Sequence, residues 1–335
     1  MNQQEAKKID LAVKKLLKEH LTRSPIIIAG ISGGPDSVFL LHQINQFITE
    51  EKPDSKAKVI IAHLNHKLRP EADSEEDFVQ NLCSRKQRLL FASKSIEIKK
   101  IAKEKKQNLE EVAREARYKF FRDLAKKHNA SAIITGHHAD DNLETILLNL
   151  TRGATLKGLT GMQISETAKG LTILRPLLNI TKDQIISYLK LKKQTFKVDL
   201  SNFDNRLSRN FLRNDVIPLL KNINPSLPQT LSQNTSELRE IENFLSTESN
   251  SWIKTHSLDQ IFTSFPLKEF LNLHPAIQKQ IIINLYHLHI KNLKNLSNKN
   301  IKEVIQLLRE NKGNKEKKLG KIIFKTQKEI FKIET

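Results

Sequence analysis

Short apolar segments alternate with longer amphipathic segments over the first two thirds of the chain. The apolar segments are rich in Ile and Val, whereas the segments between them carry apolar residues at helical spacing. Strands that alternate with helices predict an α/β fold, in which a twisted parallel sheet has helices on both faces. The expected strands are residues 25–31, 58–65, 90–98, 131–136 and 171–177. The expected helices are residues 36–49, 73–88, 107–128 and 139–152, with a further helix that opens at Thr181.

The pattern changes after Pro218. Residues 224–228 (NPSLP) are rich in turn formers and indicate a domain boundary. We therefore expect two domains, a sheet domain over residues 1–220 and a smaller, mostly helical domain over residues 221–335. As far as residue 311 the second region predicts only helices, at residues 229–246, 267–271, 275–289 and 298–310. Apolar and polar residues then alternate at 321–325 and 329–333, which predicts a closing β-hairpin.

Composition excludes several classes of protein. The single cysteine, Cys83, rules out a disulfide framework. The chain has no run of about 18 apolar residues, so a membrane span is not expected. Residues 1–20 predict a charged amphipathic helix without the apolar core of a signal peptide. We therefore expect a cytoplasmic protein with no membrane partner.

The net charge is +19, from 56 Lys and Arg against 37 Asp and Glu. Abundant Lys, Ile and Asn are typical of an AT-rich coding sequence, so composition bias explains part of this charge. Such a bias does not fix the sign of the balance, because Asp and Glu are free to rise as well. A polyanionic partner, nucleic acid above all, is therefore the favoured interpretation.

The strongest chemical signal is SGGPDS, which follows the first expected strand and opens the first helix. Two glycines let backbone amides approach a phosphate, two serines add hydroxyl donors, and the helix N-terminus adds partial positive charge. An acid in such a loop repels the anion unless a divalent cation lies between them, so Asp36 indicates Mg²⁺ on a pyrophosphate. An ordinary strand-to-helix turn explains two adjacent glycines but not the whole motif. The expected phosphate-binding residues are Ser32, Gly33, Gly34, Pro35, Asp36 and Ser37.

A second motif, GHHADDNLET at residues 136–145, follows the fourth expected strand and should reach the same edge of the sheet. Asp141 and Glu144 are three residues apart and share a helix face. Two carboxylates and an imidazole at a phosphate site can hold Mg²⁺ or orient a nucleophile. Helix capping explains Asp140 or Asp141 singly, but it does not explain His137 beside a second histidine. The clustered acids and the single cysteine favour a harder ion than Zn²⁺.

These motifs carry a resemblance to a known family. SGGPDS resembles the loop of the PP-loop (N-type) ATP pyrophosphatases, a superfamily with a Rossmann-like sheet. Taken in order, the sequence blocks resemble the tRNA(Ile)-lysidine synthetase family over about residues 24–220. The family usually has Gly where Lys67 stands and often has Pro where Leu200 stands. The blocks are SGGPDS, HLNHKLR (63–69), NLEE (108–111), AREARY (113–118), GHHADDNLET, RPLL (175–178), DLSN (199–202) and the segment 209–213.

The resemblance implies a two-step reaction. ATP adenylates the C2 oxygen of the wobble cytidine of an isoleucine tRNA with a CAU anticodon, and pyrophosphate leaves. The ε-amine of free L-lysine then displaces AMP and forms lysidine, so the tRNA reads AUA instead of AUG. The implied cofactors are ATP and Mg²⁺, with Asp36 and Asp141 as metal ligands. The lysine amine must lose a proton before it attacks. Sequence does not rank the candidates for this role, which are His137, Asp140, Asp141 and Glu144.

Five arginines are the expected tRNA contacts. Arg114 and Arg117 lie on one helix face, although a solvated basic face explains this pair equally well. Arg206, Arg209 and Arg213 are spaced for one side of a helix and predict a phosphate-contacting stripe.

Two other functions stay open at this stage. A tRNA thiolase of the same superfamily would need cysteines to carry persulfide or to hold an iron–sulfur cluster, and the single cysteine is remote from both motifs. A non-catalytic RNA-binding protein on the same scaffold would need neither Asp36 nor the second acid cluster. Dimers occur in such families, so a homodimer is an assembly that the sequence allows.

Overall fold

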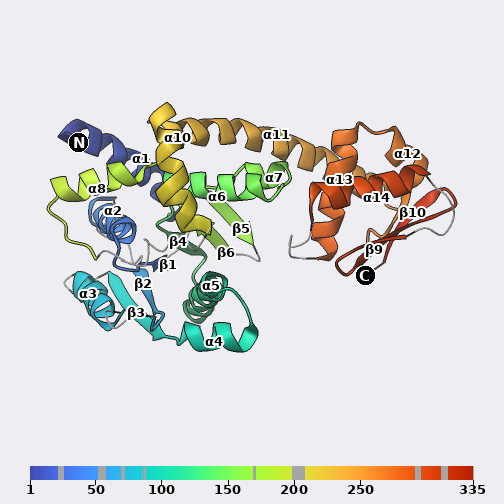
Figure 1. Ribbon diagram of the computed structural model, residues 1–335. Coiled ribbons are helices and arrows are strands. Elements are labelled where there is room, and N and C mark those ends of the chain that lie inside the picture. Colours follow the sequence, from blue (N-terminus) through green and yellow to red (C-terminus); the bar gives the residue numbers. More distant parts are fainter. Residues whose placement is uncertain are drawn as a thin grey trace. The chain divides into compact units, whose positions relative to one another are not determined.

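The computed structural model contains two compact units (Figure 1). The first, called the sheet unit below, comprises Met1–Thr145 and Met162–Ser232. The second, called the C-terminal unit, comprises Ile146–Gly161 and Gln233–Thr335, so the division is not a single cut in the sequence. The structure describes residues 1–21, 26–51, 58–68, 72–84, 86, 88–168, 171–197, 208–290, 296–310 and 316–334.

The sheet unit is built on a six-stranded sheet in the order β3-β2-β1-β4-β6-β5. Neighbouring strands from β3 to β6 are parallel, and β5 is an antiparallel edge strand. The strands are β1 (Ile26–Gly30), β2 (Lys58–Asn65), β3 (Leu89–Ser95), β4 (Ala132–Thr135), β5 (Ser165–Ala168) and β6 (Leu171–Leu174). The helices are α1 (Gln3–Leu21), α2 (Pro35–Glu51), α3 (Ala72–Ser84), α4 (Ile98–Lys105), α5 (Leu109–His128), α8 (Lys182–Leu191), α9 (Ser208–Phe211), a π-helical turn (Leu212–Val216) and α10 (Ile217–Ile223). Two helices have residues in both units, α6 (Ala139–Thr151) and α11 (Leu227–His256).

Helices cover both faces of this sheet, because successive side chains of a strand point to opposite sides. Ile27 and Ala29 of β1 pack in a core with α1, α2 and α8. Ile28 packs in a separate core with Phe120 and Phe121 of α5, on the face that Figure 1 shows covered by that helix. The alternation of β1 therefore explains the two-layered core, and it confirms the predicted α/β fold.

The sheet unit also contains elements that the periodicity does not predict. Strand β5 has the sequence SETA and pairs with a single neighbour, so it needs no apolar pattern. The expected strand over residues 90–98 ends at Ser95, because Ile98 begins the lysine-rich helix α4. After β2, Lys67 has a φ of 50°, in the left-handed region that favours glycine. The backbone turn is thus kept at a position where the resembling family usually has Gly.

The C-terminal unit contains an antiparallel sheet in the order β7-β10-β9-β8. Phe324, Phe331 and Phe265 lie on its buried face and form a core with α13 and α14. The predicted hairpin is present as β9 and β10. The expectation of helices alone before residue 311 is wrong at β7, which pairs with β10 and is too short to show alternation. The remaining elements are α7 (Leu156–Leu159), β7 (Ser264–Pro266), α12 (Leu267–Asn272), α13 (Pro275–His289), α14 (Asn298–Glu310), β8 (Glu316–Leu319), β9 (Ile322–Gln327) and β10 (Ile330–Glu334).

Within the described ranges, no helix combines the length and apolar character that crossing a membrane requires.

Candidate active site

The loop between β1 and α2 folds tightly onto the start of its own helix. Gly33 has a φ of 93°, and a Cβ atom there would lie 3.3 Å from the side chain of Val79. The Ser37 hydroxyl accepts a hydrogen bond from the Gly33 amide (3.0 Å) and donates one to the Gly34 carbonyl (2.8 Å). Pro35 begins the helix, where its fixed φ and missing N–H cost nothing. The loop thus presents a helix N-terminus at the carboxyl end of β1, an arrangement suited to an anion.

The loop after β4 packs directly against this first loop. A Cβ atom on Gly136 would lie 3.3 Å from the backbone carbonyl of Asp36, so a larger residue would press the two loops apart. Strands β1 and β4 are neighbours, which brings both motifs to one edge of the sheet as predicted. Helix α6 then begins, and the His138 amide donates to Asp141 Oδ2 (3.1 Å). Asp141 therefore does cap the helix, but its carboxylate has other partners as well.

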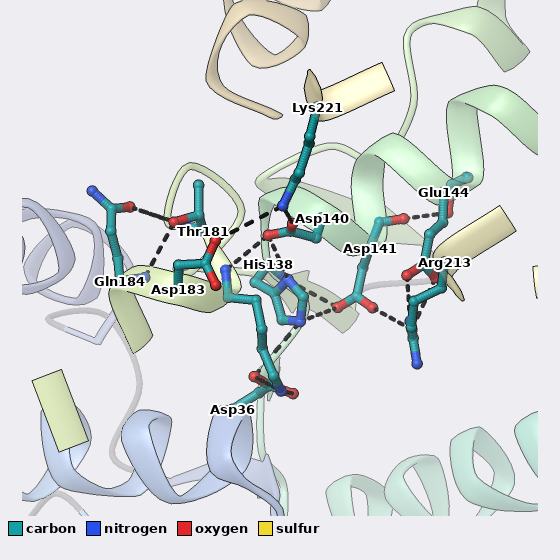
Figure 2. Close-up of polar contacts among 12 residues, drawn as sticks. Asp36, His138, Asp140, Asp141, Glu144, Thr181, Asp183, Gln184, Arg213 and Lys221 are labelled. Atoms are coloured by element: carbon teal, nitrogen blue, oxygen red, sulfur yellow. Dashed lines mark hydrogen bonds and ion pairs between the residues drawn. The ribbon is translucent and has the colours of Figure 1, made fainter. Parts of the chain in front are cut away.

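A buried imidazole joins the two motifs (Figure 2). His138 is 5 % exposed, and its Nε2 lies 3.6 Å from Asp36 and 3.4 Å from Asp141. Its Nδ1 lies 3.7 Å from Asp140. Burial alone would lower the pKa of His138, but the carboxylates of Asp141 and Asp36 outweigh it and raise the pKa to about 8. His138 is therefore an imidazolium at neutral pH that holds the acids of both motifs together.

The same contacts keep the acids ionised. Burial by itself raises the pKa of Asp36, but the neighbouring His138 and Lys182 lower it to about 2. Burial also opposes ionisation of Asp141, whose pKa is nevertheless lowered by His138 and His137. The site thus holds two carboxylates that stay negative over the physiological range.

Two lysines from later helices complete the centre, and sequence reasoning missed both. Lys182 Nζ donates to the two carboxylate oxygens of Asp36 at 2.6 and 2.8 Å. Lys221 Nζ donates to Asp140 Oδ1 at 2.8 Å, as Figure 2 shows. Lysines are common throughout this chain, so neither stands out by composition. Their positions at the N-terminus of α8 and in α10 become informative only when the sheet topology is known.

Glu144 and Asp141 share a helix face, as predicted, and meet one guanidinium. Arg213 makes a bidentate contact with Glu144 at 2.6 and 2.9 Å and lies 3.6 Å from Asp141. Burial raises the pKa of Glu144, which is 1 % exposed, although Arg213 opposes the shift. Arg209 donates to the Thr145 hydroxyl at 2.9 Å. Arg213 belongs to a π-helical turn, a feature that often occurs at functional sites.

His137 lies beside this centre in a different electrostatic environment. Burial lowers its pKa to about 4, and the positive charges of Arg175, Arg114 and Arg117 add to the shift. Its Nδ1 is hydrogen-bonded to the Thr135 hydroxyl at 2.8 Å. His137 is therefore neutral at physiological pH. Arg114 and Arg117 of α5 are exposed and close enough to His137 to lower its pKa.

The fate of the other predicted site residues is mixed. The phosphate loop and the acids of both motifs come together. Arg209 and Arg213 contact Thr145 and Glu144, and their role as phosphate contacts stays a prediction. Arg206 lies outside the residues that the structure describes, as do the block at residues 199–202 and Arg69.

The donor set suits a metal that arrives with a nucleotide. In the described part of the chain, no group of three or more His, Cys, Asp or Glu forms a ready metal site. Asp36 and Asp141 nevertheless approach the same imidazole nitrogen within 3.6 Å. Mg²⁺ is usually held by one or two carboxylates, with phosphate oxygens and waters as its other ligands. This pair of carboxylates fits that mode.

Comparisons with known proteins agree with this geometry. The tRNA(Ile)-lysidine synthase of Bacillus subtilis (strain 168) is 34% identical over 288 residues, which are 83% of this chain and 60% of that protein. A tRNA(Ile)-lysidine synthase of Bacillus cereus is 32% identical over 289 residues, covering 84% and 59%. The bifunctional protein TilS/HprT of Listeria monocytogenes is 34% identical over 273 residues, covering 81% and 41%. This chain therefore spans about 60% or less of the length of these relatives.

Among solved structures, the U34-tRNA thiolase NcsA from Methanococcus maripaludis, with its [4Fe-4S] cluster, superposes with a TM-score of 0.58 at 16% identity. The superposition covers 70% of this chain and 79% of that one, and at this identity it shows the fold alone. The family model described as a PP-loop domain matches residues 3–220. The match includes the phosphate loop, the GHHADDNLET motif, Arg209 and Arg213. This chain therefore belongs to the PP-loop domain family.

Proposed function

We propose that this chain ligates free L-lysine to C2 of the wobble cytidine in the CAU anticodon of an isoleucine tRNA, with ATP as the activating substrate. One observation carries the proposal above all. The carboxylates of Asp36 and Asp141, one from each motif, meet at a single buried imidazole beside the phosphate loop. The similarity to tRNA(Ile)-lysidine synthases supports the choice of substrates.

In the first step, the C2 oxygen of the cytidine attacks the α-phosphorus of ATP. The bond between that phosphorus and the α–β bridging oxygen breaks, and its electron pair leaves with pyrophosphate. Backbone amides and hydroxyls of residues 32–37 are placed to receive the developing negative charge. Mg²⁺, held by Asp36 and Asp141, would supply further charge neutralisation at the phosphates.

In the second step, the ε-amine of lysine attacks C2, the C2–oxygen bond breaks, and AMP leaves. The attacking nitrogen must give up a proton, and we propose Glu144 as its acceptor. The pKa of Glu144 is raised by burial, which makes it a better base than Asp141, whose pKa is lowered. Because Arg213 is bound to Glu144 at 2.6 Å, it would have to share this carboxylate with the incoming amine.

The tRNA contacts are assigned by exposure. Arg114 and Arg117 are exposed beside His137, so we propose them as contacts to the anticodon region. Arg209 and Arg213 already contact groups of the site, and we assign them to the reaction centre. Residues 221–335 would supply further tRNA contacts, while residues 1–220 would bind ATP.

A thiolase is disfavoured by the state of Cys83. This thiol is 3 % exposed in the core of the sheet unit, and burial raises its pKa to about 11. A persulfide carrier needs an accessible thiolate. Cys83 does not meet that need.

The test is pyrophosphate release measured with and without each substrate. We expect release that depends on tRNA, with lysidine formed only when lysine is also present. Asp36→Asn should lower turnover by at least about 100-fold and leave tRNA affinity nearly unchanged. Pyrophosphate release without any modified cytidine, or normal turnover by the Asp36→Asn variant, would contradict the proposal.

A further inference from the structure

Lys182 occupies an unusual place in the candidate site. Its ammonium bridges both oxygens of Asp36, a residue 146 positions earlier in the chain. The side chain of Lys182 is 36% exposed and that of Asp36 is 28% exposed, so the pair is in contact with solvent. An ion pair that only stabilises the fold does not need a carboxylate of the phosphate loop as its partner. Lys182 instead binds both oxygens of Asp36, the carboxylate that we propose as a metal ligand.

The backbone of Lys182 is held by hydrogen bonds that do not involve its ammonium group. Thr181 and Gln184 form a capping box at the start of α8, and the Lys182 amide donates to Asp140 Oδ2 at 2.8 Å. The Ala139 amide donates to the Ile180 carbonyl at 2.9 Å, which ties the start of α6 to the same segment. The four-carbon stem of a lysine has several rotatable bonds, so Nζ can move while the backbone stays.

The observed pair is incompatible with a metal on the same carboxylate. Mg²⁺ binds carboxylate oxygens at about 2.0–2.1 Å and requires near-octahedral geometry. An ammonium that holds both oxygens of Asp36 repels a second cation there and blocks its approach. A metal that entered with ATP would bring the polyphosphate with it, and the loop over residues 32–37 is suited to bind that anion.

We propose that Lys182 is a mobile counter-ion of this site, which holds Asp36 in the free protein and moves to the polyphosphate when ATP binds with its metal. In the first state it pairs, together with His138, with the carboxylate of Asp36 and occupies both of its oxygens. In the second it adds a positive charge to the phosphates that leave as pyrophosphate. This inference rests on the proposed ATP-binding function, and it makes Lys182 a phosphate-binding residue.

The exchange predicts effects of opposite sign for the metal alone and for the metal with nucleotide. Without nucleotide, Lys182→Met should bind Mn²⁺ at least about tenfold more tightly than the unmodified protein, because the competing ammonium is gone. With Mg²⁺ and a non-hydrolysable ATP analogue, the same variant should bind about tenfold more weakly, because a phosphate contact is lost. Both affinities are measured by titration calorimetry, with paramagnetic resonance of free Mn²⁺ as a second readout.

Two further variants separate this exchange from general electrostatics. Lys221→Met removes a comparable ammonium from Asp140, which faces the other nitrogen of His138, and should leave Mn²⁺ affinity within about twofold. Lys182→Arg keeps the charge and should keep Mn²⁺ binding weak. An equal gain in both methionine variants, an unchanged Mn²⁺ affinity in Lys182→Met, or tighter metal binding without weaker nucleotide binding would each overturn the exchange.

The same experiments keep this inference apart from the ligase function. The role of Lys182 is decided by two affinities, for Mn²⁺ alone and for the ATP analogue with Mg²⁺, each compared between Lys182→Met and the unmodified protein. Lysine- and tRNA-dependent product formation by the unmodified protein decides the function. Circular dichroism of each variant checks that the fold is intact, which is expected because the replaced side chain is partly exposed.

Discussion

The two sheets of this chain shield opposite kinds of side chain from water. At the carboxyl edge of the parallel sheet, His138 and Glu144 are 5% and 1% exposed and form a network of charges. On the buried face of the antiparallel sheet, Phe324 and Phe331 are 0% exposed, and the charged residues of the same strands lie on the other face. Burying charge costs free energy that burying apolar surface supplies. The comparison therefore locates chemistry in the first sheet and scaffolding in the second.

If the second sheet is a scaffold, its stability depends on apolar volume. Replacing Phe331 with Ala should lower the free energy of unfolding of the C-terminal unit by about 3–5 kcal/mol, because the side chain is fully buried among aromatic rings. Lys332→Ala, one position along the same strand, should change it by about 0.5 kcal/mol or less. Urea unfolding followed by fluorescence of Trp252, which stacks on Phe265 in this core, measures both. Equal losses in the two variants would refute the scaffold interpretation.

The first sheet should respond to a change of charge more than to a change of volume. Glu144→Gln keeps the shape of the side chain, removes its charge, and should reduce lysidine formation by at least about 100-fold. The matched control is Glu166→Gln, because Glu166 also pairs with an arginine, Arg175, but is 54% exposed. That variant should keep turnover within about twofold. A comparable loss in both variants would remove Glu144 from the reaction.

Sequence predicts this chemistry only where it is local. SGGPDS and GHHADDNLET each carry their donors within ten residues, and parallel strands bring the two motifs together. Lys182 and Lys221 have no such signal, because each reaches the site from a helix that a topology must first position. Spacing singles out Arg209 and Arg213 as phosphate contacts, which stays a prediction, but spacing does not show that buried acids are their partners.

The fold shows the same limit. Helices α13 and α14 are predicted with their bounds, and the strands with long apolar segments are predicted to within a few residues at their ends. Strands β5, β7 and β8 are missed, because each is a short edge strand whose position depends on a partner that comes later in the chain. Pairing between strands that are distant in the sequence does not require an apolar–polar alternation in a short edge strand, so the sequence shows no pattern there.

The two adjacent histidines of the second motif offer a finer comparison within the first sheet. The pKa of His138 is raised to about 8, so this residue should lose its proton at a higher pH than an ordinary histidine, whose pKa is near 6.5. The pKa of His137 is lowered to about 4, so this residue should lose its proton at a lower pH. The stability from His138 is fully present below pH 6.5 and is lost as the pH rises through 8, a change of about 2 kcal/mol. The stability from a neutral His137 is present above pH 6.5 and is lost as the pH falls toward 4.

Imidazole resonances followed by NMR in the absence of Mg²⁺ and ATP measure both values, and His137→Gln and His138→Gln assign them. Two histidines that titrate together near their ordinary pKa would show that the charge network does not form in solution.

The smallest expected effect concerns four lysines of the β8–β9 hairpin. Lys317, which lies opposite the buried Phe324, pairs with Glu303 of α14, and Lys325 pairs with Glu334. Lys318 of β8 and Lys321 of the turn before β9 are exposed. A lysine that neutralises a tRNA phosphate contributes about 0.7–0.9 to the slope of log affinity against log salt, because a counterion is released. Lys318→Gln with Lys321→Gln should therefore flatten the slope by roughly 1.4–1.8. Lys317→Gln with Lys325→Gln should flatten the slope less, because their charges are already balanced by Glu303 and Glu334.

Lys315, which precedes β8 in the sequence, lies outside the described residues. The measurement is tRNA affinity over a salt series, and an unchanged slope in the first pair would mean that Lys318 and Lys321 do not contact the tRNA.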